Sequence, residues 1–224
     1  MPATLPVPVP EPPPDAGRAS RRGQVGLSTW SFGADGRAVV LVPAWAEPTQ
    51  KLPLLLALHG RGEALKGPDK GVMGWPEDYA LVRAIQRVCA PPLTSDDLEG
   101  FVDPKRLAAH NDDLAKRPFG GMVVVCPYSP DVELRKPAAI ARYAEHVMKE
   151  VLPRARAELP VLLTAAATGI DGVSLGGALA LRIGLGNPEA FGAVGSLQAA
   201  IGEDQVGDFA GLVKRAREKN PAQK

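Results

Sequence analysis

The fold of this chain is decided by Gly172-Val173-Ser174-Leu175-Gly176-Gly177, where a serine has a glycine two positions away on either side. Residues 168–173, which lead into the serine, form a short apolar run. Residues 175–185 have the composition of a helix that stops at Gly186-Asn187-Pro188. Small residues on both sides of Ser174 allow a sharp turn, because larger side chains two positions from its apex would collide. The stretch therefore predicts a strand that passes directly into a helix, with Ser174 at the turn.

Other segments of the chain extend this strand–helix pattern into an α/β fold. Residues 24–32 and 37–43, separated by a glycine-containing loop, predict a β-hairpin. Short apolar runs without alternation are typical of strands buried on both faces. Alternating strands and helices favour a mostly parallel sheet flanked by helices. The buried strands are expected at 53–58, 121–126, 168–173 and 192–197, and the helices at 77–89, 103–115, 137–152, 175–185 and 205–219.

Composition excludes several classes of protein. The 224 residues are 45% hydrophobic and 23% charged, as in an ordinary globular protein, and one domain is the expectation for this length. The formal net charge of +1 gives no general attraction to nucleic acid or to an anionic membrane. No apolar run approaches the roughly 20 residues that span a bilayer. Cys89 and Cys126 lack metal-ligand spacing and are interpreted as buried thiols, with a single disulfide as the alternative.

The amino-terminal segment differs from the rest in composition. Residues 1–14 contain seven prolines, which favour an extended and solvated chain. We interpret residues 1–22 as a flexible proline-rich leader and residues 23–224 as the α/β domain. The leader has neither a basic region nor a continuous apolar region, so it does not read as a signal peptide. Location in the cytoplasm is therefore the default, and export is the alternative if the true start lies upstream.

These motifs carry a resemblance to a known family. The G-x-S-x-G-G turn, preceded by a buried strand that ends in His59-Gly60-Arg61-Gly62, resembles the α/β-hydrolase superfamily. Residues 172–181 look most like its putative-esterase branch, which includes enterochelin, feruloyl and acetyl-xylan esterases and mycolyltransferases. The resemblance spans about residues 37–200. It implies a serine carboxylic-ester hydrolase that uses no cofactor and no metal and acts on a small-molecule or polysaccharide-linked ester.

The resemblance also implies roles for particular residues. Ser174 would be the nucleophile, and the backbone N–H of Leu175 would hold the oxyanion together with an N–H from Arg61 or Gly62. His59 and Gly60 would shape the loop that carries this second donor. Three glycines would allow the turn and the close packing of the helix that follows it: Gly172, Gly176 and Gly177.

The proton acceptor of a serine hydrolase is the missing feature. A serine hydroxyl is a poor nucleophile unless a base takes its proton. In this superfamily the acid and then the histidine follow the serine. Here 50 residues follow Ser174 and none is a histidine, while His59, His110 and His146 all precede it. We interpret His59 as part of the oxyanion loop, and His110 and His146 as surface residues.

The carboxyl-terminal part of the family fold also has no counterpart in this sequence. Two further strand–helix units would carry the acid and the histidine, so we expect an incomplete domain whose strand at 192–197 forms an exposed sheet edge. Three hypotheses remain open: an esterase whose acid and histidine come from sequence outside this chain, a catalytically inactive fragment or binding module, and an enzyme completed by a second chain that supplies the missing strands. Substrate specificity is expected in the insertion at 62–118.

Overall fold

One six-stranded sheet organises the molecule. The computed structural model describes residues 21–33 and 36–223, and its strands run in the order β1-β2-β4-β3-β5-β6. Strands β4, β3, β5 and β6 are parallel, whereas β1 and β2 form an antiparallel hairpin whose second strand pairs antiparallel with β4. The mostly parallel sheet and the hairpin are both confirmed. The strands are β1 Val25–Phe32, β2 Gly36–Pro43, β3 Leu54–Leu58, β4 Val123–Pro127, β5 Thr168–Gly172 and β6 Ala193–Val194.

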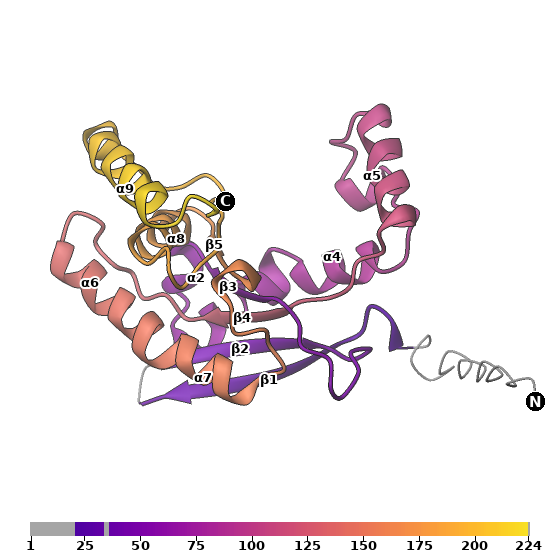
Figure 1. Cartoon of the computed structure of the whole chain (residues 1–224), viewed down its shortest axis with the longest axis horizontal. Helices are drawn as coiled ribbons and strands as arrows, with labels where there is room; N and C mark the ends of the chain where they lie inside the picture. Colours follow the sequence, from indigo (N-terminus) through magenta and orange to yellow (C-terminus); the bar gives the residue numbers. More distant parts are fainter. Residues whose placement is uncertain (1–20, 34–35, 224) are drawn as a thin grey trace, which may run out of the picture.

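Helices cover both faces of this sheet (Figure 1). On one face, side chains such as Val147, Leu179 and Ile183 from α6, the π-helical turn after it and α8 pack against Leu56 and Val125 of the sheet. Successive residues of a strand point to opposite faces of the sheet. On the other face, Val72, directly after α3, and Ile85 of α4 belong to the same core cluster as the strand residues Val39, Ala57 and Val124. The helices are α2 Arg61–Ala64, α3 Pro68–Gly71, α4 Leu81–Val88, α5 Pro104–Lys116, α6 Pro137–His146, α7 Leu152–Glu158, α8 Leu175–Gly186 and α9 Val206–Lys219.

Two predicted helices differ from those observed. The helix expected at 77–89 is split into a π-helical turn, Gly74–Asp78, and α4, because Ala80 adopts the left-handed conformation with φ 54°. The helix expected at 137–152 does not end or kink the chain at Pro153. It continues through a π-helical turn, Val147–Val151, into α7. Pro153 cannot donate a backbone hydrogen bond, and it comes directly after the π-helical turn, where the regular α-helical hydrogen-bonding pattern is interrupted.

The last strand is shorter than the sequence suggested. Residues 192–197 predicted a full strand, but β6 contains two residues and lies at the edge of the sheet. Beyond it, the Leu197 N–H still donates to the Gly172 carbonyl at 2.8 Å, so the segment continues alongside β5 in irregular form. A short edge strand presents few unpaired backbone groups.

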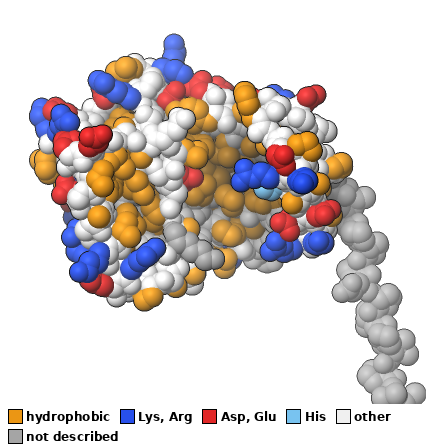
Figure 2. Space-filling view, turned by 90° about the horizontal axis from the view of Figure 1, so that it is seen from above, with side chains coloured by type: hydrophobic (Ala, Val, Ile, Leu, Met, Phe, Trp, Pro, Cys, Tyr) orange, Lys and Arg blue, Asp and Glu red, His pale blue; other side chains and the backbone are white. Residues whose placement is uncertain are grey.

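The remaining sequence-based interpretations concern the cysteines, the leader and the surface. Cys89 and Cys126 are both free and buried, which confirms the thiol interpretation, and burial raises the pKa of both. Residues 1–20 of the predicted leader lie outside the described residues. Among the residues that are described, no helix is long and apolar enough to cross a membrane. Figure 2 shows charges of both signs interspersed over one face, with hydrophobic side chains gathered in a hollow between them.

Candidate active site

Ser174 occupies a strained turn between β5 and α8. Its backbone has φ 54° and ψ −114°, which is unusual for any residue other than glycine and costs about 1–3 kcal/mol. A Cβ at Gly172 would lie under 3.0 Å from the carbonyl of Gly176, and one at Gly177 would lie 2.7 Å from Ser196 Oγ. The glycines on both sides of the serine are therefore required by contacts within the turn, as the sequence predicted.

The turn is held against the neighbouring strand and the loop that follows β6. Val173 N–H donates to the Leu58 carbonyl at 3.1 Å, and Ser174 N–H donates to the Leu197 carbonyl at 2.9 Å. The Ser174 carbonyl accepts from the N–H groups of Ala178 and Ala200. Within residues 21–33 and 36–223 the Ser174 hydroxyl has no hydrogen-bonding partner. Backbone contacts thus fix the turn and leave the hydroxyl available.

The loop after β3 lies directly beside the serine. A Cβ at Gly60 would lie 3.6 Å from Ser174 Cβ, and a Cβ at Gly176 would lie 2.5 Å from the His59 carbonyl oxygen. The ends of β3 and β5 are parallel neighbours, so their following loops meet at the same edge of the sheet. The structure brings His59, Gly60 and Ser174 together, as the resemblance implied.

His59 holds this loop in place through both nitrogens of its ring. Its ring is buried, with Nδ1 2.9 Å from the Gly60 carbonyl and Nε2 2.9 Å from the Ser129 nitrogen. The Ser129 N–H can only donate, so Nε2 accepts and Nδ1 carries the proton of a neutral imidazole. Burial is the main cause that lowers the pKa of His59 below its ordinary value. Because both nitrogens are engaged, His59 has a structural position in the loop and is not oriented as a base.

Arg61 and Gly60 are also tethered. The Arg61 guanidinium forms a two-point ion pair with Asp131, with distances of 2.9 and 3.0 Å. The Gly60 N–H donates to the Tyr79 hydroxyl at 3.1 Å. Nothing in the sequence pattern identified Asp131 or Tyr79, since each lies far along the chain from the motif that it contacts.

The arrangement supplies candidate donors for a negatively charged oxygen. Leu175, at the first position of α8, and Arg61 and Gly62, at the start of α2, have N–H groups for which a helix provides no internal acceptor. The amino-terminal end of α8 also carries partial positive charge beside Ser174. Backbone N–H groups arranged in this way can stabilise an anion that develops on a substrate.

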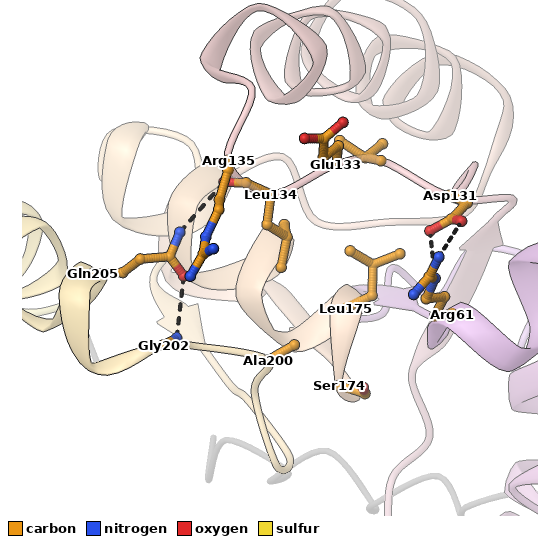
Figure 3. A pocket seen from close by; sticks show the side chains of 11 residues that line it. Arg61, Asp131, Glu133, Leu134, Arg135, Ser174, Leu175, Ala200, Gly202 and Gln205 are labelled. Carbon is orange, nitrogen blue, oxygen red and sulfur yellow. Dashed lines mark hydrogen bonds and ion pairs between the residues drawn. The ribbon is translucent and has the colours of Figure 1, made fainter.

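A cleft of about 600 Å³ opens over Ser174 and is large enough for a small organic ligand (Figure 3). The Arg61–Asp131 pair stands on one side and Arg135 and Gln205 on the other, with Leu134 and Leu175 between them. Its described lining includes no residue from 62–118, the insertion in which specificity was expected. The lining residues are Arg61, Asp131, Val132, Glu133, Leu134, Arg135, Ser174, Leu175, Ala200, Gly202 and Gln205.

The remaining histidines lie apart from the cleft. His110 is exposed on α5, as predicted. His146 is not on a solvated face: it is half-buried against the ring of Phe32, and its Nδ1 lies 3.2 Å from Glu150. The prediction overlooked that this face of α6 packs against the hairpin. No cluster of metal-binding side chains occurs among the described residues.

Comparison with known proteins finds a family model that matches part of this chain. The family model described as a putative esterase matches residues 132–217, a segment that includes Ser174 and α8. That segment is similar to the putative-esterase family. No curated protein sequence matches the chain. The esterase-like segment thus contains the strained turn, while the His59–Gly62 loop lies before it.

Solved structures of esterases share the fold. A ferulic acid esterase is 19% identical, with a TM-score of 0.56 over 86% of this chain and 67% of its own. The S-formylglutathione hydrolase FrmB from Staphylococcus aureus is 11% identical, with a TM-score of 0.54 over 88% of this chain and 69% of its own. At these identities the likeness establishes the α/β-hydrolase fold.

Proposed function

We propose that this chain carries the nucleophile and oxyanion hole of a serine carboxylic-ester hydrolase. The observation that carries the proposal is the position of Ser174. It lies in a strained turn at the start of α8, with the His59–Gly62 loop against it and a cleft above it. Strain of this kind persists where the surroundings impose it, and it is concentrated at functional sites.

The proposed reaction follows from these groups. Ser174 Oγ attacks the ester carbonyl carbon, and the carbonyl oxygen becomes an oxyanion that accepts hydrogen bonds from the N–H groups of Leu175 and of Arg61 or Gly62. Collapse of this intermediate expels the alcohol, which takes up the proton that left the Ser174 hydroxyl, and leaves an acyl group on Ser174. Attack by water then releases the acid and regenerates the hydroxyl. The mixed apolar and polar lining of the cleft suits a small-molecule ester or the ester group of a polysaccharide.

The proton acceptor is not among the histidines of this sequence. His59 is engaged through both ring nitrogens, His110 lies on α5, and His146 contacts Phe32 and Glu150. We propose that turnover of an unactivated ester requires an acid and a histidine from outside this chain. The alternative is an inactive fragment or binding module. This alternative is favoured by His59, because both of its ring nitrogens already have hydrogen-bonding partners.

Hydrolysis of p-nitrophenyl acetate tests the proposal, because this ester has a leaving group that needs no acid. We expect slow acylation that disappears in Ser174→Ala and rises steadily with pH, since hydroxide replaces the missing base. A rate plateau near pH 7 would instead identify a titrating base within the chain. Equal rates for wild type and Ser174→Ala would exclude catalysis through Ser174 and leave the binding-module alternative.

A further inference from the structure

Tyr79 makes a hydrogen-bonding relay at the loop beside Ser174. Its hydroxyl accepts from the Gly60 N–H at 3.1 Å and donates to the Glu63 carboxylate through a short hydrogen bond. Burial and this bond to Glu63 raise the pKa of Tyr79 well above its ordinary value. The hydroxyl therefore stays protonated and oriented, with its proton on the Glu63 side and a lone pair toward Gly60.

Glu63 is itself fixed in place. Its side chain is only 12% exposed, and a Cβ at Gly74 would lie 2.7 Å from Glu63 Cγ. Lys66 lies 4.0 Å from the Glu63 carboxylate and pairs with Asp78 at 2.6 Å. A buried carboxylate with a defined partner holds that partner more rigidly than a solvated one would.

Tyr79, Glu63 and Ser174 all lie close to Gly60. A Cβ at Gly60 would lie 3.1 Å from the Tyr79 hydroxyl, 3.2 Å from Glu63 Oε2 and 3.6 Å from Ser174 Cβ. A side chain at Gly60 would therefore be tight against Tyr79 and Glu63 and in ordinary contact with Ser174. The next two residues, Arg61 and Gly62, carry the N–H groups proposed to hold the oxyanion.

The backbone around Tyr79, from Gly74 to Ala80, is irregular. Tyr79 N–H donates to the Gly74 carbonyl at 2.8 Å, which closes the π-helical turn, and the next residue, Ala80, has φ 54°. Such turns and left-handed non-glycine residues occur frequently at functional sites. Trp75 packs edge-on against the Tyr79 ring at 5.4 Å between centroids. The irregular backbone thus sets the ring against the loop.

We propose that Tyr79 and Glu63 are positioning residues for the oxyanion hole. Glu63 orients the Tyr79 hydroxyl, the hydroxyl holds the Gly60 N–H, and this contact aims the N–H groups of Arg61 and Gly62 at the cleft above Ser174. The inference rests on the proposed function, because it assigns these residues a part in the same site. It adds two side chains that do not line the cleft.

The test compares Tyr79→Phe and Glu63→Gln with wild type. Tyr79→Phe removes only the hydroxyl, and Glu63→Gln keeps the shape but removes the charge. Thr168→Val is the matched control, because it removes a buried hydroxyl that donates to the Thr164 carbonyl at the start of β5, at the end of that strand away from Ser174. The readouts are the rate constant for labelling of Ser174 by a fluorophosphonate, hydrogen exchange at residues 60–62 and the thermal midpoint. A loose oxyanion donor costs about 100-fold in rate.

We expect Tyr79→Phe to slow labelling by about 10- to 100-fold and to speed amide exchange at residues 60–62, with Glu63→Gln intermediate. Thr168→Val should label at the wild-type rate. The inference is overturned if Tyr79→Phe labels as fast as wild type, or if its slower labelling follows only from a lowered thermal midpoint without faster exchange in the loop. If wild type itself is not labelled at Ser174 even at alkaline pH, where hydroxide replaces the missing base, the proposed function fails first and this inference falls with it.

Discussion

Replacement of Gly176 by alanine tests the packing of the turn most sharply. A Cβ at this position would lie 2.5 Å from the His59 carbonyl oxygen and closer still to that of Leu58. Ordinary contact begins at 3.4 Å, so α8 would have to move about 1 Å from β3. Overpacking of this kind costs about 1–3 kcal/mol, which exceeds the gain of up to about 1 kcal/mol from helix propensity. A 1 Å displacement of a reacting group also costs about 100-fold in rate.

Gly207→Ala in α9 is the control, because a Cβ there meets nothing within 4 Å. It should stabilise the protein by about 0.4–1 kcal/mol. Gly176→Ala should lower the thermal midpoint by about 2–4 °C for each kcal/mol lost and slow fluorophosphonate labelling of Ser174. Thermal denaturation and labelling rates measure both effects. If Gly176→Ala is as stable and as reactive as wild type, α8 is not packed on β3 as described.

Three further predictions concern stability. The pKa of His59 is lower in the folded protein than in the unfolded chain, where it is near 6.5. His59 therefore lowers the free energy of unfolding as the pH falls below 6.5, and it costs nothing at higher pH. Urea unfolding should show that the free energy of unfolding falls by up to about 1.4 kcal/mol per pH unit below pH 6.5, and that it falls less in His59→Gln. An equal fall in the variant would contradict the attribution of this pH dependence to His59. Ser174→Gly should be about 1 kcal/mol more stable than Ser174→Ala by thermal denaturation, because glycine relieves the positive φ; a less stable glycine variant would argue against strain. Asn111→Ala should increase proteolysis between α4 and α5, because its side chain bonds both backbone groups of Leu93; unchanged cleavage would show that these bonds do not hold the segment.

The strands and the turn at Ser174 could be predicted from the sequence because they depend on interactions between residues a few positions apart. The glycines around Ser174 report directly on a turn in which neighbouring residues collide, and apolar runs report strands buried on both faces. Asp171, near the end of β5, is equally local in its effect: its Oδ1 accepts from the Gly172 N–H at 2.6 Å. These features depend on residues a few positions apart.

Features that depend on distant contacts escaped the sequence. The π-helical turns and the left-handed Ala80 arise where Tyr79 and the α6–α7 helix meet their neighbours, and no periodicity encodes them. His146 was assigned to solvent because its partner Phe32 lies in the hairpin. Asp204 pairs with Arg135, far from it in the sequence, at 3.3 Å. Tertiary pairing of this kind becomes visible only when the fold is known.

The most direct test of the account is a crystal structure of the chain after reaction with a fluorophosphonate. The account predicts a phosphonyl group on Ser174 Oγ whose phosphoryl oxygen lies about 2.7–3.1 Å from the N–H nitrogens of Leu175 and of Arg61 or Gly62. An adduct on another residue, or a phosphoryl oxygen that points away from both N–H groups, would contradict the central claim that this turn and loop form an oxyanion hole.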